Sequence, residues 1–320
     1  MLVKLLEPLN VPDSVIEELA QPIRDLGHEF VYYNQKTTDA DELTERSQGA
    51  DVVMIANNPY PTQAIDANDN LKLINVAFTG FDHVALADAK RCDEILMSNA
   101  AGYANQAVAE LVIGLVLDVY RKITQGNEDI RAKDFPGPIQ GREILGKTVG
   151  IVGTGKIGMM TARLFHAFGA KLIGFDSGVN PEAKEVGMEY RTLEELLQEA
   201  DIVSLHLPLN DSTRGIIGEK ELALMKDTAV LINTARGPVV DNVALAKALE
   251  DGVIAGAGID VFDGEPPLPA DYPLLSAPNA VLTPHVAFLT DESMVLRAGI
   301  AFDNTINFLK GEPTNIVNRK

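Results

Sequence analysis

Arg236, Glu265 and His285 are polar residues that each follow a short apolar run in the second half of the 320-residue sequence. A histidine can give or take a proton near neutral pH, which the interconversion of an alcohol and a carbonyl group requires. A nearby carboxylate raises the pKa of a histidine and fixes its tautomer, and an arginine offers a planar fork that matches a substrate carboxylate. The three residue types together indicate an oxidation or reduction at a C–OH or C=O centre.

Each of these residues alone also has an ordinary structural explanation. Arg236 could form a surface ion pair, Glu265 could brace a loop, and His285 could be a partly buried histidine with satisfied hydrogen bonds. The carboxyl ends of parallel strands lie at one edge of a sheet, where the sites of open α/β folds gather. Catalysis is therefore the favoured interpretation of the set.

A glycine-rich turn stands between an apolar run and a predicted helix. Its spacing is G-x-G-x-x-G, and its predicted cofactor-binding residues are Gly153, Gly155, Lys156, Ile157 and Gly158. The first glycine allows a tight turn, the second lets the backbone approach a diphosphate, and the third permits close helix–strand packing. The diphosphate is expected on the unpaired N–H groups at the helix start.

Asp176 supplies the second half of this nucleotide pattern. It ends the next apolar run, Lys171–Phe175, about 20 residues beyond the turn, where dinucleotide-binding folds place an acid for the ribose hydroxyls. Ser177 and Gly178 follow, rather than an arginine that would accept a 2′-phosphate. The pattern predicts NAD rather than NADP. The alternative is a glycine-rich turn and a surface aspartate in an ordinary αβ unit.

The elements that must position these residues alternate between short apolar runs and helix-length amphipathic segments, which predicts parallel sheets with crossover helices. In the first part of the chain we expect strands at Leu2–Leu6, Glu29–Tyr33, Asp51–Ala56, Leu71–Phe78 and Ile95–Ser98, and helices at Asp13–Leu26, Asp39–Gln48, Thr62–Ala67 and Val84–Arg91. In the second part we expect strands at Thr148–Val152, Lys171–Phe175, Asp201–Leu207, Ala229–Asn233, Ile254–Ile259 and Ala280–Leu282, and helices at Lys156–Phe168, Leu193–Glu199, Glu219–Met225 and Asn242–Glu250. A long helix is predicted from Gln106 to Tyr120, an irregular arm from Ile123 to Lys147, and a last helix from about Thr290 to Lys310.

Charge and composition exclude several classes of protein. The chain has 46 acidic and 27 basic residues and a net charge of −19, which disfavours nucleic acid and anionic membrane surfaces as partners. Its one cysteine, Cys92, rules out an internal disulfide framework and a cysteine-based metal site, so no metal is expected. No apolar stretch is long enough for a signal peptide or a membrane span. We expect a soluble, cytoplasmic protein.

The chain resembles the D-isomer-specific 2-hydroxy acid dehydrogenase family over nearly its whole length. The resemblance is carried by Val152–Gly158 with Asp176, Val203–Leu209, Leu231–Gly237, Gly258–Phe262 with Glu265–Pro267, and Thr283–His285. Unrelated dinucleotide-binding proteins do not share the last three segments in this order. The resemblance implies an NAD-dependent enzyme that interconverts small 2-oxo and D-2-hydroxy acids, with His285 as the acid and base.

The resemblance also implies a role for each matching residue. Arg236 would bind the substrate carboxylate and 2-oxo group, and Glu265 would pair with His285. Further cofactor contacts would come from Leu207, Pro208, Thr213, Thr234, Ala235 and Asp260, the last holding the nicotinamide carboxamide. The substrate would be bound by Phe78, Thr79, Gly80 and Tyr103 together with Arg236; the less favoured alternative for the loop after Phe78 is a simple strand-to-helix turn.

The fold implied is α/β with two doubly wound parallel-sheet domains. A Rossmann NAD domain, residues 100–287, would be inserted into a flavodoxin-like substrate domain made of residues 1–99 and 288–320. A substrate site between the two would close and exclude water. The arm after the long helix forms a dimer contact in the family, so a homodimer is expected.

The branch of the family is left open by the sequence. Tyr103, seven residues before Glu110, is typical of D-lactate dehydrogenase-like members, whereas Phe262–Pro267 resembles the glycerate, hydroxypyruvate and phosphoglycerate branches. A phosphoglycerate dehydrogenase would need cations near the Phe78 loop, and none flanks it. A non-enzymatic NAD-sensing corepressor would keep the same fold and residues but would carry long extra tails. An enzyme is the favoured interpretation.

Overall fold

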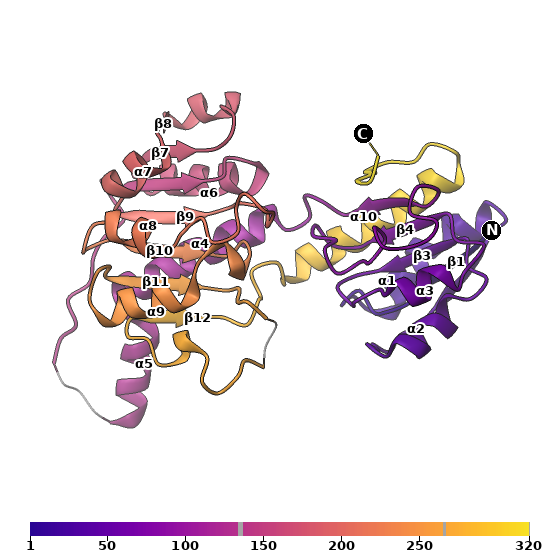
Figure 1. Ribbon diagram of the computed structural model, residues 1–320, viewed down its shortest axis with the longest axis horizontal. Coiled ribbons are helices and arrows are strands. Elements are labelled where there is room, and N and C mark those ends of the chain that lie inside the picture. The colour runs from indigo at the N-terminus through magenta and orange to yellow at the C-terminus, as the bar shows by residue number, and fades with distance from the viewer. Residues whose placement is uncertain (134–136, 265–266, 320) are drawn as a thin grey trace. The chain divides into compact units, whose positions relative to one another are not determined.

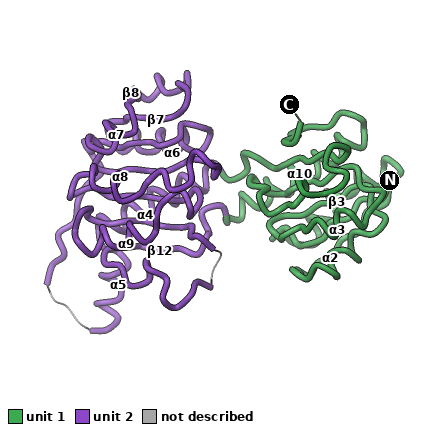
Figure 2. The backbone as a smooth tube through the Cα atoms, in the orientation of Figure 1, with its two compact units in different colours: residues 1–104, 289–320 green, residues 105–288 purple. Residues whose placement is uncertain are grey.

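The computed structural model describes residues 1–133, 137–264 and 267–319. The chain forms two compact units, Met1–Ala104 with Leu289–Lys320, and Asn105–Phe288 (Figure 2). The sequence placed the divisions after Asn99 and after Ala287, slightly before those of the structure. The first difference has a physical reason, because the ring of Tyr103 packs on that of Phe78 and keeps this segment in the first unit.

The first unit contains a parallel sheet of five strands in the order β2-β1-β3-β4-β5 (Figure 1). This is the flavodoxin-like strand order. Its elements are β1 (Leu2–Leu5), α1 (Asp13–Asp25), β2 (Glu29–Tyr32), α2 (Ala40–Ser47), β3 (Val52–Ile55), α3 (Thr62–Asp66), β4 (Leu73–Val76), β5 (Leu96–Asn99) and α10 (Asp291–Leu309). Phe302 of the C-terminal helix is fully buried, and its ring lies 5.5 Å from that of Phe30, so the end of the chain completes the core of its beginning.

The second unit contains a parallel sheet of seven strands in the order β12-β11-β10-β9-β6-β7-β8. From β8 to β11 this is the strand order of the doubly wound dinucleotide-binding fold. The strands are β6 (Thr148–Val152), β7 (Lys171–Phe175), β8 (Glu189–Tyr190), β9 (Ile202–Leu205), β10 (Val230–Asn233), β11 (Gly256–Ile259) and β12 (Ala280–Leu282). The predicted α/β fold with two parallel-sheet domains is confirmed.

Helices cover both faces of the second sheet. They are α4 (Asn105–Arg121), α5 (Ile123–Ala132), α6 (Lys156–Ala167), α7 (Leu193–Glu199), α8 (Glu219–Leu224) and α9 (Asn242–Glu250), with 3-10 turns at Pro181–Val186, Gly237–Val239 and Pro273–Leu275. One core cluster joins the sheet to α4 and α6, and another joins it to α7, α8 and α9. Strands β9, β10 and β11 are buried along their whole length, as expected for a sheet covered on both sides.

Two predicted elements are wrong. The segment Val84–Arg91 has good helix formers but forms turns, because its backbone pairs with distant residues: Ala85 N–H donates to Tyr60 O at 3.0 Å and Lys90 N–H to Asp66 Oδ1 at 2.9 Å. The Lys90 bond uses an N–H group that a helix would need, and the Ala85 bond fixes the start of the segment against a distant residue. The arm, predicted to be irregular, begins with helix α5, which follows Lys122 in the left-handed region (φ 53°).

Two kinds of feature are absent from residues 1–133, 137–264 and 267–319. No helix there is both long and apolar enough to cross a bilayer. No group of three or more His, Cys, Asp or Glu side chains in these residues is arranged to hold a metal ion.

Candidate active site

The glycine-rich turn joins β6 to α6, and two of its glycines are required by the protein itself. Gly153 has a φ of 95°, and a Cβ there would lie 2.6 Å from the carbonyl oxygen of His206. A Cβ on Gly158 would lie 2.0 Å from the carbonyl oxygen of Gly153. These two positions give the tight turn and the close packing of the helix start against it.

Gly155 differs from its two neighbours in the motif, because nothing in the protein requires a glycine there. Its φ of −68° suits any residue, and a Cβ at this position would meet no atom within 4 Å. That open space lies at the N-terminus of α6, where the N–H groups of Lys156 and Ile157 are left over by the helix. The turn therefore fits a dinucleotide diphosphate, which would occupy the space that a side chain would fill.

Asp176 follows β7 and is held by its neighbours. Its Oδ2 accepts the Thr154 N–H at 2.7 Å and the Thr154 hydroxyl at 3.2 Å, and its Oδ1 accepts the Ser177 N–H at 2.6 Å. Partial burial raises the pKa of Asp176. The hydrogen bonds from these donors together lower it by more than burial raises it, so its pKa lies below the usual value. The carboxylate is ionised and fixed at the edge of the glycine turn. The sequence did not single out Thr154, the buried residue that joins the two halves of the pattern.

The residues after β9 line the other side of the glycine turn. A Cβ on Gly153 would also meet the side chain of Leu207 at 3.2 Å, so these two predicted residues are neighbours. The hydroxyl of Thr213 donates to Pro208 O at 2.6 Å and closes the loop. Burial lowers the pKa of His206 to about 3, and its Nε2 lies 2.9 Å from the hydroxyl oxygen of Ser204.

Asn233 shapes the turn that carries Arg236 after β10. Its side chain is fully buried, accepts the Ala235 N–H at 3.0 Å and donates to Arg236 O at 2.9 Å. The Oγ1 of Thr234 is buried and has no hydrogen-bond partner among the described residues. A buried hydroxyl without a partner is costly, so Thr234 fits a contact with a bound group.

Asp260 shapes the turn that carries His285. Its carboxylate, at the end of β11, is fully buried and accepts the hydroxyl of Thr283 at 2.6 Å and the N–H groups of Val286 and Ala287, each at 2.9 Å. Burial raises the pKa of Asp260, and these donors offset part of the rise. Asp260 O also accepts the N–H of His285 at 2.9 Å. The predicted contact of Asp260 with the nicotinamide stays a prediction.

His285 itself adopts a left-handed backbone, with a φ of 54°, that a histidine rarely takes. The Asp260 bonds hold this conformation, and the ring of Phe288 meets the His285 ring edge-on at 5.5 Å. Because β10, β11 and β12 are parallel neighbours, Arg236, Asp260 and His285 stand along one edge of the sheet. Glu265, the third predicted catalytic residue, lies outside the described residues.

The predicted substrate loop belongs to the first unit. Phe78 and Tyr103 are buried with ring centroids 6.0 Å apart, and Asn99 Nδ2 donates to Thr79 O at 2.7 Å. The guanidinium of Arg297 lies 5.9 Å from the centre of the Tyr103 ring. Within the described part of the chain, the N–H groups of Thr79 and Gly80 donate no hydrogen bond. The loop is therefore held in place while two of its donors stay available.

Residues 113–287 match the model of the D-isomer specific 2-hydroxyacid dehydrogenase family, NAD binding domain. The chain belongs to this family. It is 40% identical to a glyoxylate reductase of Thermofilum pendens, over 88% of this chain and 85% of that protein. It is 38% identical to a glycerate dehydrogenase of Methylorubrum extorquens, over 95% of both chains. It also resembles the solved D-lactate dehydrogenase of Aquifex aeolicus complexed with NAD and lactic acid, with a TM-score of 0.83, 28% identity and full coverage of both chains.

Family membership confirms the predicted enzyme class and cofactor class. The chain is an NAD(P)-dependent oxidoreductase that acts on the CH–OH group of 2-hydroxy acids. The matched residues lie inside the second unit, which is its NAD-binding domain. The glycine turn and Asp176 lie within the matched residues, and their contacts with the dinucleotide stay a prediction.

Proposed function

We propose that this dehydrogenase reduces small 2-oxo acids, glyoxylate and hydroxypyruvate before others, with NADH, and also catalyses the reverse reaction. The observation that carries the chemistry is the row of strand ends β10, β11 and β12, where buried polar side chains hold Arg236 and His285. The similarity to the glyoxylate reductase and the glycerate dehydrogenase supports the choice of substrate.

The proposed roles follow from the chemistry of the side chains. NADH, when bound, supplies the hydride that reduces C2 of the substrate. His285 gives its proton to the carbonyl oxygen, and Arg236 binds the carboxylate through its planar fork. Glu265 is proposed to pair with His285 and keep it in the right tautomer. Thr79 and Gly80 are proposed to bind the same carboxylate through their N–H groups.

Substrate size is inferred from the residues around the Thr79 loop. The rings of Phe78 and Tyr103 pack on each other next to it and occupy space that a large substrate side chain would need. A substrate with hydrogen or a hydroxymethyl group on C2, such as glyoxylate or hydroxypyruvate, needs less room than phenylpyruvate. Phe78 and Tyr103 are therefore proposed to limit the size of the substrate.

The proposed preference for NADH over NADPH depends on Asp176. Its carboxylate is ionised, fixed and partly exposed, so it can accept hydrogen bonds from the two ribose hydroxyls. A 2′-phosphate at the same place would meet this negative charge. The cofactor contacts of Leu207, Pro208, Thr213, Thr234 and Ala235 are proposed from their match to the family pattern, and Leu207 also lies beside Gly153.

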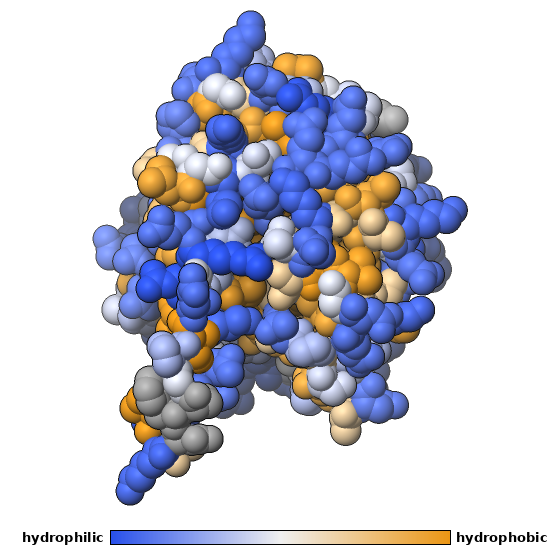
Figure 3. Space-filling view, turned by 90° about the vertical axis from the view of Figure 1, so that its left-hand side faces the viewer, coloured by the Kyte–Doolittle hydropathy of each residue, from blue (hydrophilic) through white to orange (hydrophobic). Residues whose placement is uncertain are grey.

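We also propose that the protein acts as a homodimer in the cytoplasm. Helix α5 has ten residues and none of its side chains is buried, with Ile123 and Ile130 56% and 67% exposed. Helices of this length are marginally stable in water alone, which supports packing against a second copy. Figure 3 shows a face of the molecule on which hydrophilic side chains predominate and apolar ones form separate patches.

A substrate panel tests the proposed function. Initial rates are measured with NADH and with NADPH for glyoxylate, hydroxypyruvate, pyruvate, phenylpyruvate and 3-phosphohydroxypyruvate. We expect kcat/KM with NADH to be about tenfold or more higher for glyoxylate or hydroxypyruvate than for phenylpyruvate, as steric exclusion from a small site implies. A higher value for phenylpyruvate or 3-phosphohydroxypyruvate would contradict the proposed substrate class.

A further inference from the structure

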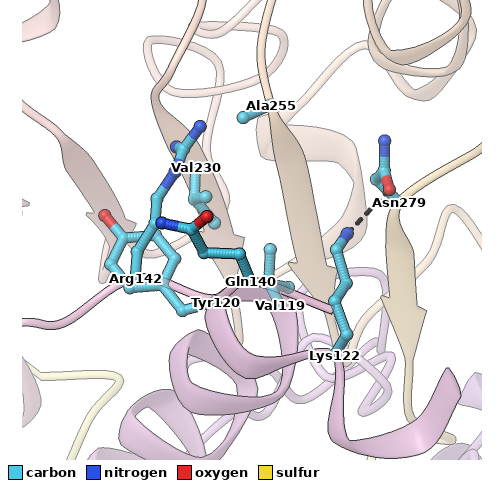
Figure 4. A pocket seen from close by; sticks show the side chains of 8 residues that line it. All are labelled: Val119, Tyr120, Lys122, Gln140, Arg142, Val230, Ala255 and Asn279. Atoms are coloured by element: carbon cyan, nitrogen blue, oxygen red, sulfur yellow. Dashed lines mark hydrogen bonds between the residues drawn. The ribbon is translucent and has the colours of Figure 1, made fainter. Parts of the chain in front are cut away.

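A cavity of about 260 Å³ opens at the amino edge of the sheet in the NAD-binding domain (Figure 4). Val230, on its wall, is the first residue of β10, while Ala255 directly precedes β11 and Asn279 directly precedes β12. The carboxyl ends of the same three strands carry the proposed catalytic residues. The cavity is therefore separated from them by the length of a strand, about 13 Å for the four residues of β10.

The other wall of the cavity comes from the end of α4 and from the last part of the arm, around residues 140–142. Lys122, in the left-handed turn after α4, donates from Nζ to Asn279 Oδ1 at 2.7 Å. Arg142 N–H donates to Tyr120 O at 3.1 Å, and Arg142 Nη1 donates to Thr228 O. A Cβ on Gly141 would lie 2.7 Å from Tyr120 O, so a glycine is needed for this close approach. Both cations are thus held by defined contacts at the cavity.

The charges around this cavity are unusual for so acidic a protein. Among the residues that the structure describes, neither Lys122 nor Arg142 lies within 4 Å of a carboxylate oxygen. Burial and the charge of Arg142 lower the pKa of Lys122, and the negative charge of Asp118 offsets part of this shift. Two like charges therefore share a partly enclosed space, in a chain where acids outnumber bases by 46 to 27.

Polar amides and apolar side chains complete the lining of the cavity. The side chain of Gln140 lies between the two cations in Figure 4. Asn279 uses its Oδ1 for Lys122, which leaves its Nδ2 as a donor. Val119 and Val230, two apolar residues of the lining, are 5% and 1% exposed. The donors and positive charges of the cavity, with no acid among the described residues that line it, match the chemistry of an oxyanion.

We propose that this cavity binds a small oxyanion, a phosphate or a carboxylate group, between Lys122 and Arg142. The arginine supplies a planar fork and the lysine a point charge, and Gln140 and Asn279 donate further hydrogen bonds. The bound anion offsets the repulsion between the two cations. The site is separate from the proposed active site and can be filled while NAD is bound.

Binding to the NAD-saturated enzyme tests this proposal, because NAD then occupies the diphosphate site on α6. The melting temperature is measured against increasing inorganic phosphate and, separately, succinate, with sodium chloride at equal ionic strength as the blank. We expect a saturable rise with at least one probe, and the stronger probe distinguishes a phosphate ligand from a carboxylate ligand. The double variant Lys122→Met/Arg142→Met should bind that probe at least tenfold more weakly, and Lys184→Met, which removes an exposed cation elsewhere, should bind like the wild type.

Two outcomes would overturn the proposal. In the first, neither anion has a saturable effect on the wild type beyond that of chloride; if the double variant then also loses its dimer in sedimentation, the cavity is instead a contact with a second copy. In the second, the double variant responds to the probe like the wild type, which would place the anion elsewhere.

A second measurement does not depend on the stability of the variants. Crystals of the wild-type enzyme with NAD are soaked in selenate, and its anomalous scattering is located. A peak between Lys122 and Arg142 supports the proposal. Peaks at other positions only, under conditions where this cavity is open to solvent in the crystal, contradict it.

Discussion

The carboxyl ends of the strands are held differently in the two units. In the NAD-binding domain, the buried side chains of Asn233 and Asp260 hold the turns after β10 and β12 through hydrogen bonds. In the first unit, aromatic packing of Phe78 and Tyr103 acts together with the hydrogen bond from Asn99 to Thr79 O to hold the loop after β4. A buried polar group that loses its partners is costly. Under the proposed roles, the chemistry therefore depends on turns that tolerate little change, and substrate choice depends in part on aromatic packing that can be adjusted.

Among the variants that test this comparison, Asp260→Ala is expected to have the largest effect, because it removes the carboxylate that holds the turn after β12. The N–H groups of Val286 and Ala287 lose their acceptor, and the left-handed turn of His285 is released. We expect kcat/KM for glyoxylate to fall about a thousandfold and the melting temperature to fall by several degrees. Steady-state kinetics and thermal unfolding measure the two effects. Asp227→Ala, which removes an exposed carboxylate, is the control and should behave like the wild type. A variant with near-wild-type kcat/KM would contradict the role of Asp260.

Arg236→Lys is expected to have the next largest effect, because the charge stays and the planar fork is lost. We expect kcat/KM for 2-oxo acids to fall about a hundredfold while the Kd for NADH stays within about twofold. Initial rates and fluorescence titration of NADH measure the two quantities. Turnover of 2-oxo acids near the wild-type level would show that Arg236 does not bind the carboxylate.

Tyr103→Ala tests the role of aromatic packing in the first unit. Removing the ring enlarges the space beside Phe78 and leaves the turns of the NAD-binding domain intact. We expect the ratio of kcat/KM for phenylpyruvate to that for glyoxylate to rise about tenfold, a typical effect of pocket size. Tyr103→Phe keeps the ring and is the matched control. If both variants kept the wild-type ratio, Tyr103 would not limit substrate size.

His206 gives the smallest effect, and it appears as a pH dependence of stability. Burial lowers the folded-state pKa of His206 from 6.5 to about 3, so the neutral imidazole stabilises the folded state above pH 6.5. This contribution is lost as the pH falls below 6.5, by at most about 1.4 kcal/mol for each pH unit. Urea unfolding at pH 6.5 and 5.5 should show a steeper loss for the wild type than for His206→Gln. The exposed His166→Gln should keep the wild-type slope, and equal slopes in all three proteins would contradict the prediction.

The sequence indicated which polar residues stand at the strand ends, but not all of the residues that support them. Arg236, Asp260 and His285 could be placed together because apolar runs reveal buried strands, and parallel strands end at one edge. Asn233 and Thr154 were not singled out, since their importance depends on which backbone groups lack a partner after folding. This depends on the tertiary structure, so it produces no recognisable pattern of residue spacing in the sequence.

The two incorrect elements have different origins. Residues Val84–Arg91 favour a helix locally, but their N–H groups bond to Tyr60 and Asp66, more than 20 residues away. Helix α5 contains Gly126 and precedes a stretch rich in glycine and proline, so the sequence favoured an irregular arm. Local propensity is a weak guide wherever distant contacts decide the backbone.

We propose that the His285 side chain supplies the proton for the reduction of a 2-oxo acid by NADH. The most direct test compares the single-turnover oxidation of bound NADH by glyoxylate in the wild type and in His285→Ala. We expect rapid oxidation in the wild type, and a rate about a thousandfold or more lower in the variant with its NADH affinity unchanged. A wild-type enzyme that does not oxidise NADH, or a variant that oxidises it at the wild-type rate, would contradict the account.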